Sequence, residues 1–180
     1  TLVIAIAGFA VATAVADPVS LLTLDPGHFH AALVQKTMPE GVSPVVHVYA
    51  PSGPDLDRHL ALLQGFNTRA ENPTKWETKV HTGPGYLEEM LAERPGNVVV
   101  ISGNNAKKSR YILECVKAGL NVMADKPMAI NPEGFGLIQE AYKIAAEKAM
   151  NPITRTRSLQ FLVAVYGADK LNDPSQQEPL

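Results

Sequence analysis

Short apolar runs alternate with longer segments of helical period along most of the chain. The apolar runs predict strands at residues 20–25, 45–50, 97–103 and 121–127, and a looser strand is expected around residues 77–81. Two of these runs, 97–103 and 121–127, are almost uninterrupted, which is typical of strands that are buried on both faces of a sheet.

The segments between the strands place apolar residues three and four positions apart, as amphipathic helices do. They predict helices at residues 28–38, 55–66, 86–94, 107–119 and 133–150. The last helix has Asn131 as its N-cap and Pro132 in its first turn. Alternating strands and helices form a parallel sheet with helices on both faces. The pattern therefore predicts an α/β fold over residues 20–150, a doubly wound parallel sheet of the Rossmann-like kind.

The two ends of the chain depart from this pattern. Residues 1–16 are apolar and uncharged and end in Ala-Val-Ala, which resembles the core and cleavage site of a secretory signal peptide. We expect export, to the periplasm or by secretion, or a cytoplasmic location if this segment is instead a strand and a helix. The run is shorter than the ~20 apolar residues that span a membrane, so no stable membrane anchor is expected. Residues 151–180 are mostly polar and predict a poorly ordered tail.

Composition and charge exclude several classes of protein. With 180 residues, 46% of them hydrophobic, the chain can form one globular domain. A net charge of −2 and the lack of any basic run argue against nucleic acid as a partner. Cys115 is the single cysteine, which excludes an internal disulfide and a cysteine-based metal site. A homo-oligomer is compatible with the sequence, which gives no measure of oligomeric state.

The loop after the first strand, "DPGHFH", suggests two kinds of ligand. Set against the dinucleotide fingerprint G-x-G-x-x-G, Asp25 takes the place of the first glycine, Gly27 the second and His30 the third. Gly27 would let the backbone approach a pyrophosphate, with His28 and Phe29 beside it. The pair His28 and His30 also resembles the metal-binding His-x-His of amidohydrolase-type barrels. A metal-dependent hydrolase needs eight βα units and further ligands at later strand ends, and we find neither, so no metal is predicted.

Two later loops carry polar residues that would meet at the same edge of the sheet. The fourth strand is followed by Ser102, Gly103, Asn104 and Asn105, which leave room for a flat ligand and can hydrogen bond to it. They also suit the N-terminal cap of a helix, and the two roles are compatible. The fifth strand ends in Asp125, Lys126 and Pro127. Burying these charges is costly unless they serve a function or pair with each other.

The segment "NVVVISGNN…YILECVKAGLNVMADKP" resembles the run from fourth to fifth strand in the glucose-fructose oxidoreductase/inositol dehydrogenase family (Gfo/Idh/MocA), with Asp125 in place of the usual glutamate. The stretches "LTLDPGHFHAALVQ", "VYAPSGPDLDRHL" and "GFNTRAENPTKW" resemble a subgroup provisionally labelled as oxidoreductases. The resemblance covers residues 21–150 approximately, and it is specific as a combination of motifs.

This resemblance implies a function and a set of roles. Members of the family bind NAD or NADP and oxidise or reduce a sugar or polyol carbon. Lys126 would act as the catalytic residue near the nicotinamide, and Pro127, whose peptide bond is often cis in relatives, would shape the turn. Asn104 and Asn105 would line the cofactor. The implied partner is a small carbohydrate-like molecule.

The chain also departs from the family. No acidic residue ends the second strand, where Tyr49 to Ser52 stand, so the sequence does not distinguish NAD from NADP. No counterpart of the C-terminal α/β substrate domain follows Met150. The sequence therefore leaves two functions open, an NAD(P)-dependent oxidoreductase represented by its cofactor domain, and a non-catalytic nucleotide-binding or interaction module.

Overall fold

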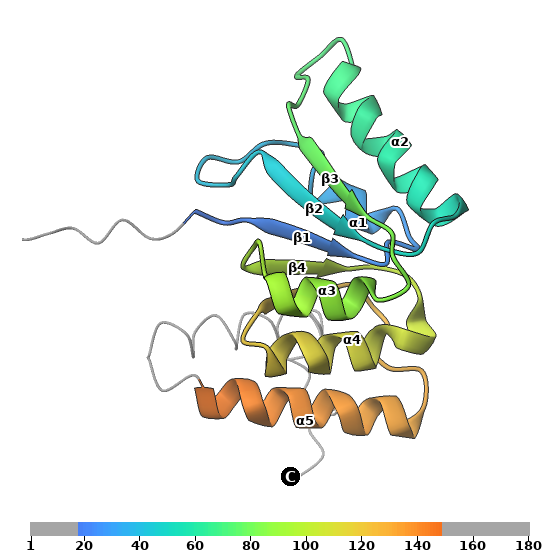
Figure 1. Cartoon of the computed structure of the whole chain (residues 1–180), viewed down its shortest axis with the longest axis vertical. Coiled ribbons are helices and arrows are strands. Elements are labelled where there is room, and N and C mark those ends of the chain that lie inside the picture. The colour runs from blue at the N-terminus through green and yellow to red at the C-terminus, as the bar shows by residue number, and fades with distance from the viewer. Residues whose placement is uncertain (1–17, 149–180) are drawn as a thin grey trace, which may run out of the picture.

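The computed structural model describes residues 18–148 as one parallel sheet covered on both faces by helices (Figure 1). The strands are β1 (Leu21–Leu24), β2 (Val45–Tyr49), β3 (Glu77–His81), β4 (Val98–Ile101) and β5 (Asn121–Ala124). The helices are α1 (His30–Leu33), α2 (Pro54–Thr68), α3 (Tyr86–Glu93), α4 (Asn105–Lys117) and α5 (Pro132–Lys148). The expectations for residues 1–16 and 151–180 lie outside the described residues.

The strand order is β3-β2-β1-β4-β5, and every pair is parallel. The chain thus builds outward from β1 to β3, then crosses back to place β4 on the other side of β1. This order confirms the doubly wound, Rossmann-like prediction. It also creates a switch point between β1 and β4, where such sheets bind ligands at the carboxyl ends of their strands.

Alternate residues of the strands pack into two separate cores. One face of the sheet directs Leu22, Leu24 and Ile101 towards helices α3 and α4, against which α5 packs in turn. The other face directs Val46 and Val48 towards α1 and α2. Figure 1 shows these two helical layers on opposite sides of the strands. None of the helices within residues 18–148 is long and apolar enough to cross a membrane.

Two predicted elements differ from the structure. The helix expected at 28–38 ends after one turn, at Leu33. The carbonyl of Gln35 accepts a hydrogen bond from the Trp76 indole at 2.6 Å, and that of Lys36 accepts one from Arg69 at 2.7 Å. The Gln35 and Lys36 amides bond to carbonyls three positions back, those of Ala32 and Leu33, and the contacts from Trp76 and Arg69 accompany this tighter turn.

The run 121–127 is shorter and more exposed than predicted. Strand β5 covers only four residues, and Met123 is 49% exposed. The reason is its place at the edge of the sheet, where one side of the strand has no neighbouring strand among residues 18–148. By contrast, β4 lies between β1 and β5, and Val99, Val100 and Ile101 are buried as expected. The Asn131 cap is confirmed, because its Oδ1 accepts a hydrogen bond from the Gly134 amide at 2.7 Å.

Candidate functional site

The loops that follow β1, β4 and β5 meet around one open cleft of about 360 Å³. This cleft is lined by eight of the site residues that the sequence predicted: Gly27, His28, His30, Gly103, Asn104, Asn105, Asp125 and Lys126. The cleft lies at the carboxyl ends of the strands and at the switch point. The structure therefore brings together most of the predicted site from three distant parts of the chain.

The β1 and β4 loops are in backbone contact through two glycines. The amides of Gly27 and His28 both donate to the Ser102 carbonyl, at 2.9 and 3.2 Å. A Cβ on Gly103 would lie 2.5 Å from the Gly27 Cα, and Gly103 has a φ of +93°. Gly27 was expected to serve a pyrophosphate. In the structure its own Cβ direction faces the Asn104 amide at 3.1 Å, so close loop packing already requires a residue without a side chain here.

Asp25 replaces a glycine because aspartate tolerates the same backbone conformation. Its φ is +46°, in the left-handed region that only glycine, asparagine and aspartate enter readily. The side chain is buried, and its Oδ2 accepts hydrogen bonds from Tyr111 and Asn104, both at 2.7 Å. Asp25 does not line the cleft. Its visible role is to tie the β1 loop to α4, rather than to face a cofactor.

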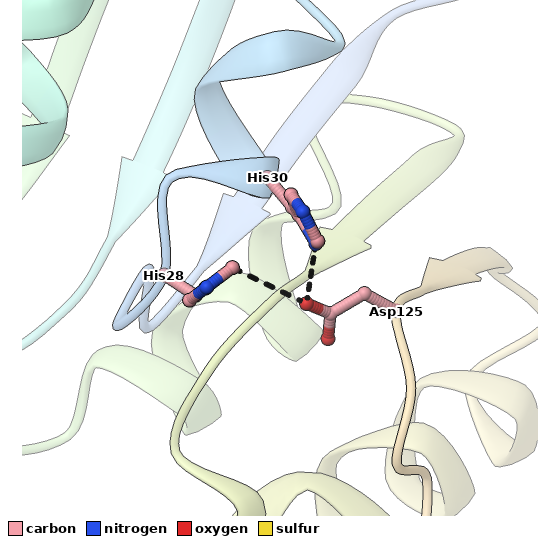
Figure 2. Close-up of side chains that lie close together, drawn as sticks. All are labelled: His28, His30 and Asp125. Carbon is pink, nitrogen blue, oxygen red and sulfur yellow. Dashed lines mark hydrogen bonds and ion pairs between the residues drawn. The ribbon is translucent and has the colours of Figure 1, made fainter.

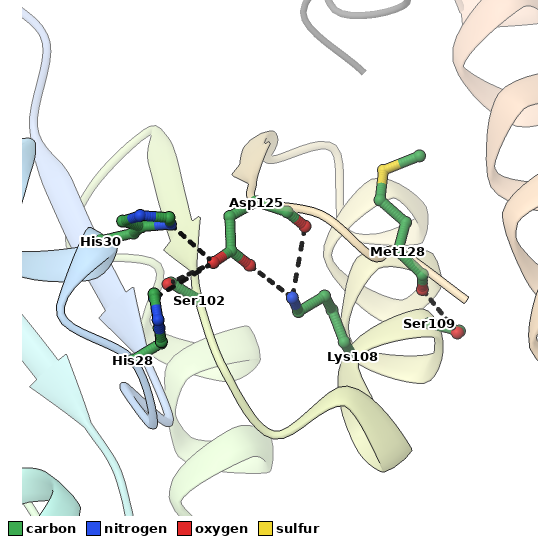
Figure 3. Close-up of polar contacts among 7 residues, drawn as sticks. All are labelled: His28, His30, Ser102, Lys108, Ser109, Asp125 and Met128. Carbon is green, nitrogen blue, oxygen red and sulfur yellow. Dashed lines mark hydrogen bonds and ion pairs between the residues drawn. The ribbon is translucent and has the colours of Figure 1, made fainter. Parts of the chain in front are cut away.

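Asp125 does not pair with Lys126, the partner considered from the sequence. It pairs with Lys108 of α4, whose side chain is completely buried and reaches Oδ1 of the carboxylate (Figure 3). Partial burial alone would raise the Asp125 pKa, but hydrogen bonds from Lys108, Ser102 and His30, with the Lys108 charge, lower it below its usual value. The sequence did not predict this role of Lys108, because a lysine in an amphipathic helix is expected to be exposed to solvent.

The same helix holds the loop that carries Lys126. Lys108 Nζ donates to the Asp125 carbonyl at 3.2 Å, and Ser109 Oγ donates to the Met128 carbonyl at 2.8 Å. The bond between Lys126 and Pro127 is cis, as the resemblance implied. Within residues 18–148 the Lys126 amine has no ion pair or hydrogen bond. Lys126 is thus held by its backbone while its side chain remains available at the cleft.

His28 and His30 both point towards Asp125 (Figure 2). The Nδ1 atom of His30 lies 3.2 Å from Asp125 Oδ2, and that of His28 lies 3.7 Å away. The sequence argument against a metal required further ligands at later strand ends and found none. Asp125 directly follows the last strand and supplies such a group, so the ligand part of that argument no longer holds, whereas the chain still lacks the eight βα units of a barrel among residues 18–148.

The other predicted site residues lie away from the lining of the cleft or bond within the loops. Phe29 is half exposed at the mouth of a small recess shared with Asp55, Arg58 and His59. Ser102 is buried and donates to Asp125 Oδ2 at 2.8 Å. Asn104 is the N-cap residue of α4 by position, although its side chain bonds Asp25 instead of the helix.

A second polar cluster lies where β2 and β3 face α3. His47 Nδ1 is 3.0 Å from His81 Nε2, and His81 Nδ1 is 2.7 Å from Glu89 Oε1. Tyr49 donates to Glu93 at 3.0 Å. Burial, followed by the neighbouring His81, lowers the His47 pKa. The contact between His47 and His81 could not be predicted from the sequence, because it depends on the register between β2 and β3.

His59 of α2 is an unusual buried histidine. Only 3% of it is exposed, and neither ring nitrogen has a hydrogen-bond partner within residues 18–148. Burial lowers its pKa to about 4. The ring is therefore neutral at pH 7.

The cleft suits a dinucleotide in position and in chemistry. It opens at the switch point of the sheet, and Asn104, Asn105 and Lys126 offer donors along it. The fold and the site together define a dinucleotide-binding domain of the Rossmann class.

Comparisons with known proteins specify the family. The family described as "Oxidoreductase family, NAD-binding Rossmann fold" (Gfo/Idh/MocA) matches residues 27–151, more than half of the chain. A solved structure from Parabacteroides merdae, provisionally named as an oxidoreductase, is 58% identical with a TM-score of 0.72. It is matched over 73% of this chain and 30% of its own length. The chain belongs to the Gfo/Idh/MocA oxidoreductase family, whose cofactor is NAD or NADP.

Two more distant structures share the fold. One, from Thermotoga maritima, also provisionally named as an oxidoreductase, is 19% identical with a TM-score of 0.54, over 72% of this chain and 36% of its own. The other, from Desulfitobacterium hafniense, is provisionally named an NADPH-dependent oxidoreductase. It is 17% identical with a TM-score of 0.52, over 72% and 33%. The chain thus spans about a third of these solved relatives. No curated protein matches it.

Proposed function

We propose that this chain is the cofactor-binding part of an oxidoreductase that acts on a sugar or polyol-type substrate. The observation that carries the proposal is the state of Lys126. The structure uses Lys108, not Lys126, to neutralise Asp125, so a second lysine remains free at the cleft. Among residues 18–148 Lys126 has no structural partner, so its amine at the switch point is suited to chemistry.

The roles of the residues follow from their positions. When bound, the nicotinamide cofactor supplies or takes the hydride. The Lys126 ammonium group would lie beside the reacting hydroxyl, where its positive charge would lower the cost of removing the proton. Asn104 and Asn105 would hold the polar edge of the cofactor by hydrogen bonds. Lys108 and Ser109 position Lys126 by holding the carbonyls on either side of it.

The first test measures binding and turnover separately. NADH and NADPH are titrated into the chain while the fluorescence of the reduced cofactor is recorded. Lys126→Met should bind cofactor within about twofold of the wild type. In a turnover assay with a panel of polyols and sugars it should act about 10²–10³-fold more slowly, the usual cost of removing one group that stabilises developing charge. Lys143→Met, on exposed α5, is the control and should change neither quantity.

A second candidate is a nucleotide-binding module without catalysis. It predicts cofactor binding with no turnover of any sugar or polyol, and no effect of Lys126→Met beyond binding. Failure to bind either cofactor would contradict both candidates.

A further inference from the structure

The three side chains at the centre of the cleft form a compact group of potential metal ligands. One nitrogen of His28, one of His30 and one oxygen of Asp125 all lie within 4.8 Å of one another. They come from the loops after β1 and β5, and Figure 2 shows both imidazoles directed at the same carboxylate oxygen.

The spacing of these atoms is close to that of a coordination sphere. Zinc lies about 2.0–2.2 Å from histidine nitrogens and carboxylate oxygens, so two ligands of a tetrahedral ion lie about 3.3 Å apart. The distances from Asp125 Oδ2 to the two Nδ1 atoms are 3.2 Å for His30 and 3.7 Å for His28. Both distances from the Asp125 oxygen are thus close to the separation of two zinc ligands.

Ordinary hydrogen bonding does not account for the whole arrangement. His30 can hydrogen bond to Asp125 at 3.2 Å, and this bond needs only one ring. His28 is too far for a hydrogen bond at 3.7 Å, yet it faces the same oxygen and contacts His30 edge-on, with ring centroids 4.3 Å apart. Convergence of a second imidazole is what a shared ion would explain.

Hydrogen bonds fix the orientation of the Asp125 carboxylate, as they do for carboxylates that bind metals. Ser102 donates a hydrogen bond to Oδ2 at 2.8 Å. The buried Lys108 ammonium group donates to Oδ1, on the far side from the histidines (Figure 3). Partners that bond a ligating carboxylate fix its orientation and tune its affinity for the ion. The two histidines remain 45% and 41% exposed, so an ion can enter and a fourth position stays open to the cleft.

We propose that His28, His30 and Asp125 form a three-ligand site for a divalent transition-metal ion of the Zn²⁺ or Co²⁺ type. Two imidazoles and one carboxylate suit these ions, whereas Mg²⁺ and Ca²⁺ prefer sites made of oxygen ligands. The inference goes beyond the proposed function and does not depend on it, because an ion can bind whether or not the cofactor does. In the assembled cleft, the open position would bind an oxygen of a substrate next to Lys126.

The test uses the untagged, metal-free chain and Co²⁺ alone, followed by its visible absorption and by calorimetry. We expect one equivalent to bind, with absorption bands typical of four-coordinate Co²⁺, and Zn²⁺ to displace it. His28→Gln and His30→Gln should each weaken binding at least tenfold. Both side chains are substantially exposed, so the variants should fold, which circular dichroism would verify.

His47→Gln and His81→Gln serve as matched controls, since they remove histidines from the other cluster. His81 with Glu89 and Glu93 is a second group of potential ligands. Unchanged affinity in these controls supports the proposal. Binding that is lost in His81→Gln but not in His30→Gln would overturn it, as would the absence of binding at micromolar Co²⁺.

Discussion

Asp125 and Lys108 show how one buried pair can decide the geometry of a site. The Lys108 side chain is fully buried, and its charge is matched by a carboxylate at the end of the neighbouring strand. Such pairs contribute little net stability compared with apolar packing, but loss of one partner leaves an uncompensated charge. The pair therefore favours one position of the β5 loop, and with it one position of Lys126.

Asp125→Asn should reduce the free energy of unfolding by about 3–5 kcal/mol, because it leaves the Lys108 ammonium group buried and unpaired. Urea denaturation measures this change. Asp55→Asn is the control, because its ion pair with Arg58 is exposed and should matter by less than about 1 kcal/mol. Adding Lys108→Met to Asp125→Asn should restore part of the loss. Equal stabilities of Asp125→Asn and wild type would contradict this account.

His59 makes stability depend on pH. Its pKa is about 4 in the folded chain and about 6.5 when unfolded, so only the unfolded state takes up a proton between these values. As far as His59 is concerned, the free energy of unfolding of the wild type should therefore be highest above pH 6.5 and should decrease as the pH drops towards 4. The loss attributable to His59 is about 3 kcal/mol.

His59→Leu should remove this loss and flatten the pH dependence between 6.5 and 4. It should also stabilise the chain at pH 7, because two unpartnered ring nitrogens are no longer buried. Denaturation at pH 7, 5.5 and 4.5 provides the comparison. Curves that fall in parallel for variant and wild type would show that His59 is not responsible.

At the scale of elements, the β1 and β4 loops act as one unit because their backbones touch. Gly103→Ala should destabilise the chain by about 2–3 kcal/mol, since its Cβ would overlap Gly27 and its φ of +93° strains any other residue. Cofactor binding should weaken as well, because separating the loops changes the cleft. Thermal unfolding and cofactor titration test the two effects.

Gly136→Ala is the control for that substitution. Gly136 lies within α5, and a Cβ there would meet nothing within 4 Å. Replacing a helical glycine by alanine should stabilise by about 0.5–1 kcal/mol. A Gly103→Ala variant as stable as this control would show that the loops are not in close contact.

The elements themselves were largely predictable from local patterns. The looser strand at 77–81 and the β4 region were located correctly, and α2, α3 and α4 differ from expectation by at most two residues at their ends. The errors at α1 and β5 have a common cause. Both depend on what lies beside the segment in space, which is the Trp76 indole in one case and, in the part of the chain that the structure describes, the edge of the sheet in the other.

At the scale of the whole molecule, the sequence predicted which loops form the candidate site but not the contacts within it. The carboxyl ends of parallel strands share one edge, so residues after β1, β4 and β5 were expected to meet, and they do. Which of them contact one another could not be predicted. The choice of Lys108 over Lys126 for Asp125 depends on how α4 packs below the β5 loop.

The sequence by itself determined the class of fold, the edge of the sheet that carries the site and the family, because periodicity and short motifs are local properties of the chain. Tertiary structure alone decided that His28, His30 and Asp125 converge, that His47 meets His81, and that Asp25 is a buried anchor. The physical reason is that strand order, register and helix packing set distances between residues as far apart in the chain as His28 and Asp125. No local pattern contains those distances.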